Sequence, residues 1–351
     1  ANGRQVPFHF FFGAPSCVPA TVFETAGARI DADAVGRLLE RDEVRYLSEM
    51  MDFPGVLNGH EEVMKKIAHA HRLGKPVDGH APGLRGEQAK GYIEAGISTD
   101  HECFTSEEAR DKLLHGMWIL VREGSAAKNF EALIDLLHDH TDRMMLCSDD
   151  KHPDGLVEGH INMLCARAVK RGIDVFKVLQ AACINPIAHY KLPVGQLRVG
   201  DPADLIVVED LNDFRVMRTF IAGELVAGEG QSLIQRVAID HINRFDRSPI
   251  SIDDLHVPKQ EEELLVIEAL DGQLITRKRW MPPTVNGDAC VSDTTKDLLK
   301  IAVVNRYTEA PVVVAWITGT GFQRGAIAGS VAHDSHNIVA VGTTDKDLCA
   351  A

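Results

Sequence analysis

Short apolar runs alternate with amphipathic stretches through the first half of the chain. The run Met144–Cys147 stops at the polar group Ser148-Asp149-Asp150, and Glu61–Leu73 carries apolar residues at helical spacing. Strands that alternate with amphipathic helices are typical of βαβ units and a parallel sheet. The pattern predicts strands over 7–12, 44–49, 75–79, 97–99, 118–121 and 144–147, and helices over 61–73, 86–95, 106–115, 129–140, 156–171 and 175–183.

The predicted strands end near residues 49, 80, 101, 123 and 149. Regular βαβ spacing of this kind favours right-handed crossovers in one parallel sheet. Five or six such units are fewer than the eight of a closed barrel. The predicted fold class is therefore α/β, as part of a (β/α)8 TIM-type barrel whose first strands would lie before Ala1.

The pattern changes after Asn185-Pro186. Short strands with glycine turns are predicted over 194–208 and 219–227, as in a small β-domain. Further strands are predicted over 264–267, 312–317 and 338–341, with a helix near 296–304, as in an additional C-terminal α/β domain. The predicted boundaries are 1–192 for the barrel portion, 193–246 for the small β-domain and 247–351 for the C-terminal domain.

The composition limits the partners of this chain. Its formal net charge of −14 argues against binding to nucleic acid or to an anionic membrane, whereas a small neutral substrate would not be repelled. The seven cysteines are scattered and form no CxxC motif, which is typical of reduced thiols in the cytoplasm. We find no apolar run long enough to span a bilayer.

Acidic and imidazole side chains follow the predicted strands. Each one alone has an ordinary explanation, because strand-to-loop junctions are polar and a lone histidine is more often a hydrogen-bonding residue than a metal ligand. Together they are more informative, since the carboxyl ends of parallel strands meet at one edge of the sheet. The candidates are Glu49, His80, His101 with its neighbours Asp100 and Glu102, Glu123, and the pair Asp149 and Asp150.

Imidazole and carboxylate ligands suit one or two divalent ions such as Zn²⁺, Mn²⁺ or Fe²⁺. Hydrolysis is the chemistry that needs them, because a bound metal lowers the pKa of water from 15.7 to about 7. Glu49 could bridge two ions. Asp149 could bind one ion and also carry the proton of the attacking water to the leaving group.

Several segments resemble the bacterial adenine deaminases of the amidohydrolase superfamily, and the resemblance covers nearly the whole chain. The strand ends carry it in SEMMDFPGV, VDGHAPGL, STDHECF, REGSAAK and CSDDKHPDGL. The segments AACINPIAHY and GQLRVGDPADLIVV are similar to the closing helix and small β-domain of the superfamily, and AIAGSVAHDSHNIVAVG to the C-terminal domain of the deaminases.

The resemblance implies hydrolysis of adenine to hypoxanthine and ammonia at a binuclear centre, expected to hold Mn²⁺, with Fe²⁺ and Zn²⁺ as alternatives. Glu49 would bridge the ions, His80 and His101 would bind one of them, and Asp149 would bind the other and shuttle the proton. Glu123 or Asp150 would lie against the purine, and Glu123 is a second catalytic candidate. Many barrels of this superfamily associate, so a homo-oligomer is expected.

One departure from the superfamily pattern leaves alternatives open. The first strand of the superfamily supplies a His-x-His pair, which this chain lacks, because His69-Ala70-His71 falls in a predicted surface helix. The chain could therefore act on another nucleobase or cyclic amide, or be a non-catalytic fragment. A second cluster, His333-Asp334-Ser335-His336, is either a metal or lid contribution or a hydrogen-bonded turn.

Overall fold

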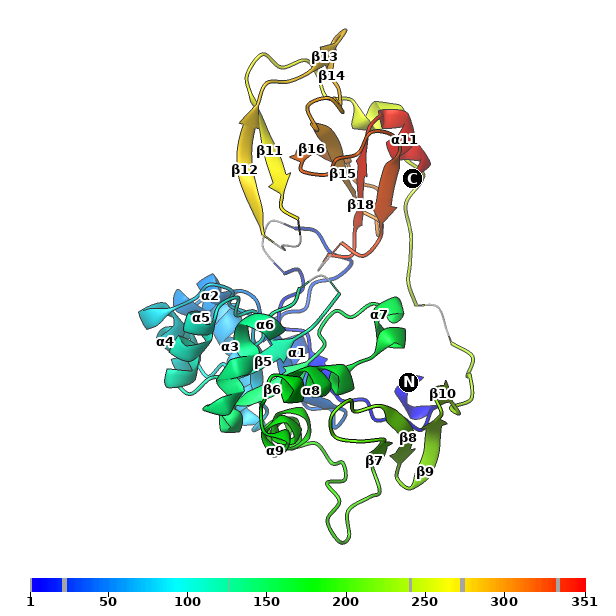
Figure 1. Cartoon of the computed structure of the whole chain (residues 1–351). Helices are drawn as coiled ribbons and strands as arrows, with labels where there is room; N and C mark the ends of the chain where they lie inside the picture. Colours follow the sequence, from blue (N-terminus) through cyan, green and yellow to red (C-terminus); the bar gives the residue numbers. More distant parts are fainter. Residues whose placement is uncertain (1, 21–23, 126, 240–241, 272–274, 333–334) are drawn as a thin grey trace. The chain divides into compact units, whose positions relative to one another are not determined.

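The computed structural model describes residues 2–20, 24–125, 127–239, 242–271, 275–332 and 335–351. The chain divides into two units (Figure 1). Unit 1 comprises Ala1–Cys17 and Ile30–Asp240, and unit 2 comprises Val18–Arg29 and His241–Ala351. The chain thus leaves unit 1 for a short segment, returns to it, and enters unit 2 again. The three-domain boundaries expected from the sequence stay a prediction.

Six parallel strands in the described part of unit 1 follow one another in chain order. Among the described residues they make two three-stranded sheets, β1-β2-β3 and β4-β5-β6. The backbone N–H of Ser98 donates to the carbonyl of Val77 (2.8 Å), so β3 and β4 lie beside each other. The strands are β1 Phe12–Ala14, β2 Val44–Met50, β3 Val77–Gly79, β4 Thr99–Asp100, β5 Trp118–Arg122 and β6 Met144–Cys147.

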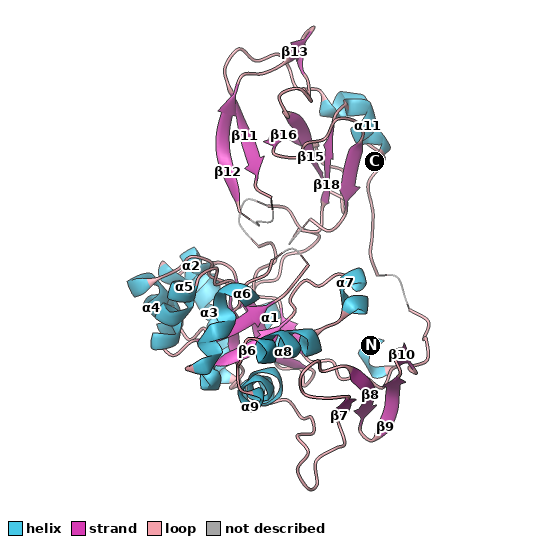
Figure 2. Ribbon diagram, viewed as in Figure 1, coloured by secondary structure: helices cyan, strands magenta, loops and turns pink. Residues whose placement is uncertain are grey.

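Helices follow these strands, which confirms the predicted alternation (Figure 2). Local capping explains two of their starts: Asp31 accepts from the N–H of Ala34, and Thr105 accepts from the N–H of Glu108. The helices are α1 Ala32–Leu39, α2 Phe53–Leu57, α3 Glu61–Arg72, α4 Gly86–Glu94, α5 Ser106–Leu114, α6 Phe130–Leu133, α7 Pro153–Glu158, α8 Ile161–Lys170, α9 Val175–Leu179 and α10 Asn185–Tyr190.

Two helices are shorter than the pattern predicts. The predicted helix over 156–171 is divided between α7 and α8, because Gly159 and His160 adopt non-helical backbone angles. The predicted helix over 129–140 continues past α6 only as the 3₁₀ turn Ile134–His138. A π-helical turn, Gln180–Ile184, joins α9 to α10.

The predicted buried strand over 7–12 is wrong. Pairing with β2 starts only at Phe12, which lies opposite Val44. Phe8 and Phe10 precede this pairing and are 52% and 43% exposed. The apolar run therefore gave the wrong position for the strand, because hydrogen bonding to β2 begins only at Phe12.

A small antiparallel sheet completes unit 1, as predicted, although within the predicted range 194–208 only Leu205–Val208 is strand. Its strands lie in the order β10-β9-β8-β7. They are β7 Leu205–Val208, β8 Val216–Ile221, β9 Glu224–Gly228 and β10 Gln231–Ser232. Ala222 and Gly223 both have positive φ (49° and 84°) in the tight turn between β8 and β9, a conformation that glycine favours.

Unit 2 is built on a mixed six-stranded sheet in the order β12-β11-β16-β15-β18-β17. The strands are β11 Leu264–Ala269, β12 Thr276–Met281, β15 Leu299–Val304, β16 Val313–Thr318, β17 Ala326–Gly329 and β18 Ile338–Gly342. A hairpin of β13 Val285–Asn286 and β14 Ala289–Cys290, the 3₁₀ turn Ile252–Leu255 and helix α11 Asp345–Ala350 complete it. Within the unit, the side-chain amide of Asn337 donates to the carbonyl of Thr25 (2.9 Å).

The predicted helix near 296–304 is wrong, because Leu299–Val304 is strand β15. This strand pairs with both β16 and β18, so it is central in the sheet. Leu299, Ala302 and Val304 are buried along it. A continuous apolar run is compatible with either a helix or a buried strand, and here pairing with two neighbouring strands selects the strand.

Two observations bear on the predictions from composition. All seven cysteines fall within the described residues and are free thiols, as predicted. In the part of the chain that the structure describes, no helix combines the length and the apolar character needed to cross a bilayer.

We expect Asn185→Ala to lower the free energy of unfolding by about 2 kcal/mol. Asn185 is buried, and its amide donates to the carbonyls of Thr141 and Met144, both at 2.7 Å, where β6 begins. The substitution would leave two carbonyls without these bonds. Urea denaturation would measure the change, with the exposed Asn212→Ala as a control that should stay within about 0.5 kcal/mol of the parent protein. An equal effect of both substitutions would contradict the prediction.

Candidate metal centre

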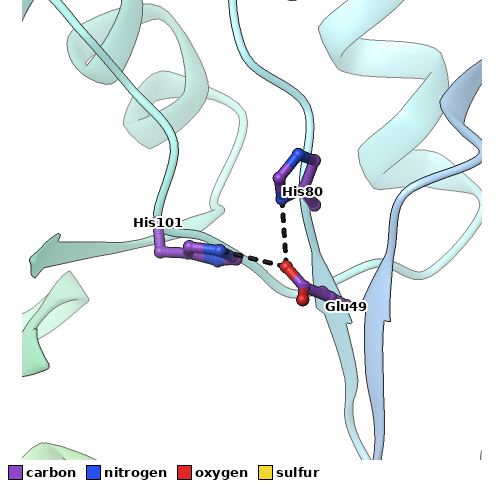
Figure 3. Close-up of side chains that lie close together, drawn as sticks. All are labelled: Glu49, His80 and His101. Atoms are coloured by element: carbon purple, nitrogen blue, oxygen red, sulfur yellow. Dashed lines mark hydrogen bonds and ion pairs between the residues drawn. The ribbon is translucent and has the colours of Figure 1, made fainter. Parts of the chain in front are cut away.

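Three predicted ligands converge at the carboxyl ends of neighbouring strands. Glu49 lies in β2, His80 directly follows β3, and His101 directly follows β4. One carboxylate oxygen of Glu49, Oε2, accepts from His80 Nδ1 at 3.0 Å and lies 3.1 Å from His101 Nε2 (Figure 3). The two imidazole rings meet edge to face, with centroids 5.4 Å apart. The parallel strands therefore bring together residues that are up to 52 positions apart in the sequence.

The donor atoms of this cluster fit a divalent cation. They all lie within 4.8 Å of one another. Ligand atoms that bind one Zn²⁺ ion at about 2.0–2.2 Å are themselves roughly 3 Å apart, which is close to the separations seen here. Two imidazoles and one carboxylate also form a donor set that Zn²⁺, Mn²⁺ and Fe²⁺ accept.

The cluster strongly favours positive charge. Burial raises the pKa of Glu49, but its bonds with His101 and His80 outweigh burial and hold that pKa well below its usual range. Burial lowers the pKa of His101, yet Glu49, Asp100 and Asp149 together raise it to about 9. Several carboxylates thus surround two imidazoles, and their negative charge would also stabilise a bound divalent cation.

Asp149 lies at the edge of this cluster, two residues beyond the end of β6. Its Oδ2 is 4.0 Å from His101 Nε2, and its side chain is 24% exposed. The backbone of Asp149 adopts a left-handed conformation, with φ of 50°, which ends the strand in a sharp turn. His101, Glu102 and Asp149 form a second group of donors within 4.8 Å of one another. Two neighbouring donor groups therefore share His101.

Two further buried residues lie beside the ligands: Glu102, which the sequence analysis considered only as a neighbour of His101, and Arg122, to which it gave no role. Arg122, the last residue of β5, pairs with both Glu102 and Asp149. Glu102 Oε1 lies 3.6 Å from His101 Nε2 and 4.0 Å from His80 Nδ1. Burial raises the pKa of Glu102, although the charge of Arg122 lowers it. A charged residue closing the apolar run WILV was the available signal for Arg122.

Glu123 and Asp150 do not belong to the donor groups formed by the described residues. Glu123 pairs with Arg167 on α8 at 2.9 Å, and the guanidinium of Arg167 also covers the ring of Phe130 at 3.9 Å. Asp150 is exposed, and its carbonyl accepts from the N–H of Ser125 at 3.0 Å. Their assigned roles toward a substrate stay predictions.

Buried polar residues support the strand that carries Glu49. The hydroxyl of Ser16 donates to the carbonyl of Glu49 at 2.5 Å, and Lys66 donates to the carbonyl of Ser16 at 2.7 Å. The hydroxyl of Tyr92 donates to the carbonyl of Met50 and accepts from the N–H of His80. The backbones that present Glu49 and His80 are therefore tied to each other.

The other histidine pairs considered in the sequence lie outside this cluster. His69 and His71 belong to α3, which confirms their predicted place in a helix; His71 bonds the carbonyl of Gly96, and His69 accepts from Arg72. His333 and Asp334 of the second cluster lie outside the described residues.

In its fold, this chain is a parallel α/β protein with imidazole and carboxylate donors at the carboxyl ends of its strands, where such proteins carry their functional sites. The chain belongs to the amidohydrolase family, whose profile matches residues 2–226, and residues 273–351 match the adenine deaminase C-terminal domain. Divalent metal ions are general in the amidohydrolase superfamily.

Curated relatives align with the whole chain. A protein named adenine deaminase from Salinibacter ruber is 55% identical, and another from Methanosarcina acetivorans is 50% identical, each over 100% of this chain. The chain spans 65% of the length of each of these relatives. A crystal structure of beta-aspartyl dipeptidase from Fervidobacterium islandicum is 16% identical, with a TM-score of 0.46 over 66% of both chains.

Proposed function

We propose that this protein takes part in the hydrolytic deamination of adenine to hypoxanthine and ammonia. The observation that carries the proposal is the convergence of Glu49, His80 and His101 at one edge of a parallel sheet, in a chain similar throughout to proteins named adenine deaminase. We further propose that the sheet of unit 1 is part of a (β/α)8 barrel. The metal centre of the proposal is binuclear, with Mn²⁺ as first candidate and Fe²⁺ and Zn²⁺ as alternatives.

Four side chains are the metal ligands of the proposal. Glu49, His80 and His101 would hold one ion. Asp149 would hold the second, and Glu49 is proposed to contribute to both. When bound, such ions supply the Lewis acidity that brings the pKa of water close to 7. Everything else in the reaction falls to the side chains of the protein.

Proton transfer is the role proposed for Asp149. Its carboxylate takes a proton from the attacking water as the water oxygen bonds to C6 of adenine. The proton then passes to the departing amino group as the C6–N bond breaks, and ammonia leaves. The remaining proton on the C6 oxygen is lost as the carbonyl forms, which restores the acid that protonates the ring. The ion pair with Arg122 orients the Asp149 carboxylate toward His101 and the other donors.

Protonation of the purine ring needs a second acid. Glu102 is the candidate that the geometry favours, because it is buried beside His80 and His101 and burial raises its pKa. Glu123 and Asp150 are retained as candidates for contacts with the purine.

The proposal is tested by mixing the Mn²⁺-loaded protein with adenine and separating the products by chromatography. We expect hypoxanthine and ammonia in equal amounts. A panel of guanine, cytosine and a dihydropyrimidine would compare substrates, and faster turnover of any of these would overturn adenine as the substrate. Absence of turnover on every base, with metal bound, would favour a non-catalytic role.

Removal of metal gives a further prediction. Dialysis against a chelator should abolish adenine turnover, and added Mn²⁺, Fe²⁺ or Zn²⁺ should restore it, because the reaction depends on activation of water. Elemental analysis before and after dialysis would measure the bound ions. Full activity in protein shown to be free of metal would contradict the proposed centre.

A further inference from the structure

A buried lysine on α5 directs its ammonium group to three acceptors beneath the metal centre. Lys112 is 1% exposed. Its Nζ donates to Asp100 Oδ2 at 2.5 Å, to Glu108 Oε1 at 2.7 Å and to the carbonyl of Ala81 at 2.8 Å. Asp100 and Glu108 are also buried, at 0% and 3% exposure. The three side chains form a buried ion triad that the proposed reaction does not use.

The same region has a donor group that could suit a metal ion. Asp100, Cys103 and Glu108 offer atoms within 4.8 Å of one another. However, Lys112 Nζ contacts all three, including Cys103 Sγ at 3.7 Å. The ammonium group therefore already supplies the positive charge that this group of donors requires.

The triad connects the two loops that carry the histidines. Ala81, whose carbonyl Lys112 binds, is adjacent to His80. Asp100 is adjacent to His101, and its Oδ1 accepts from the N–H of Glu102 at 2.9 Å. One lysine thus holds the backbone on the carboxyl side of β3 and the end of β4 at the same time.

Glu108 extends these connections further along both loops. It accepts from the N–H of Gly83 at 2.8 Å and from the N–H of Phe104 at 3.2 Å. Burial alone would lower the pKa of Lys112, but Asp100 and the other acceptors raise it above its usual value, so the residue carries its charge. A charged lysine keeps all three protons for these bonds.

We propose that Lys112 is a positioning residue that fixes His80 and His101 at the separation a metal ion requires. The inference rests on the metal site proposed above and deepens it. Metal affinity depends on ligand placement within about 0.5 Å, and a buried triad restrains both loops from below. Burial of the three charged side chains has a desolvation cost, so a role in positioning the ligands would explain why the triad is present.

The test compares Mn²⁺ affinity in two variants that neutralise opposite charges, Lys112→Met and Glu108→Gln. Competition with a chromogenic chelator would measure the dissociation constants. If the triad acts only through its electrostatic field, loss of the lysine charge should tighten Mn²⁺ binding, and loss of the glutamate charge should weaken it. If it positions the ligands, both variants should weaken binding, by about tenfold or more.

Lys300→Met is the matched control. Lys300 in unit 2 is also fully buried and binds Asp345 at 2.8 Å and the carbonyl of Leu255 at 2.8 Å. We expect this variant to lose stability while its Mn²⁺ affinity stays within about twofold of the parent protein. If Lys112→Met does not fold, Lys112→Arg replaces it, because this variant keeps the positive charge but cannot keep the three bonds of Nζ in place. An electrostatic role alone predicts unchanged Mn²⁺ affinity in Lys112→Arg, whereas the positioning role predicts weaker binding.

The outcomes separate this inference from the proposed function. A parent protein that binds no Mn²⁺ would refute the metal centre itself. A parent protein that binds Mn²⁺, together with a folded Lys112→Met variant of equal or higher affinity, would refute only the positioning role. Weaker binding in both triad variants and not in the control would support it.

Discussion

Asp149→Asn is expected to lower kcat for adenine by about a thousandfold, within the 10²–10⁴ range that a single acid–base residue contributes. The amide keeps the size of the side chain but cannot accept the proton of the attacking water. It also removes one negative charge from the neighbourhood of His101, whose Nε2 lies 4.0 Å from Asp149 Oδ2. Both losses act on the same step, so the effect should fall on kcat more than on KM.

Metal content must be measured together with the rate, because Asp149 is proposed both as ligand and as proton carrier. At saturating Mn²⁺, the variant should bind at least one ion and remain slow. The matched control is Asp154→Asn, which changes an exposed residue in the first turn of α7. A loss of less than tenfold in Asp149→Asn at full metal occupancy would refute the role in proton transfer.

Glu49→Gln should first weaken metal binding, by about a hundredfold or more. Loss of a residue that only hydrogen-bonds to a metal ligand already lowers metal affinity by about 10–100-fold, and Glu49 is itself a ligand in the proposal. Oε2 of Glu49 is the atom that both His80 Nδ1 and His101 Nε2 approach within 3.1 Å. A neutral amide oxygen is a weaker ligand than a carboxylate. The variant should therefore contain less metal after gel filtration.

Elemental analysis of the purified variant would measure this loss, and excess Mn²⁺ should recover part of the activity. Glu209→Gln is a suitable control, since Glu209 pairs with Arg215 at 2.6 Å on the surface of unit 1. The control should retain its metal. Normal metal content in Glu49→Gln would exclude Glu49 as a principal ligand.

The ligand cluster could be predicted because it depends on the most regular feature of the chain. Glu49 lies near the end of one predicted strand, and His80 and His101 directly follow two others; the parallel arrangement brings such ends to one edge. No side-chain detail is needed for that inference. The alternation of strand and helix in unit 1 could be predicted for the same reason.

Contacts that depend on side-chain direction could not be predicted. Arg122 closes an apolar strand, and only the fold shows that it turns toward Glu102 and Asp149. Lys112 lies in SEEARDKLL, which has the composition of a surface helix, although the lysine is buried. The run at Leu299–Val304 suits both helix and strand, and its two neighbouring strands decide the outcome.

The excursion of Val18–Arg29 into unit 2 limits how the molecule can be divided. A fragment starting at His241 would lack Thr25, the acceptor of the Asn337 amide, and Gly27, whose Cα lies so near the ring of Tyr307 that a methyl group there would come within 2.5 Å of it. A single splice point therefore cannot yield both units intact. Chimeras and circular permutants should transfer residues 18–29 together with the C-terminal sheet.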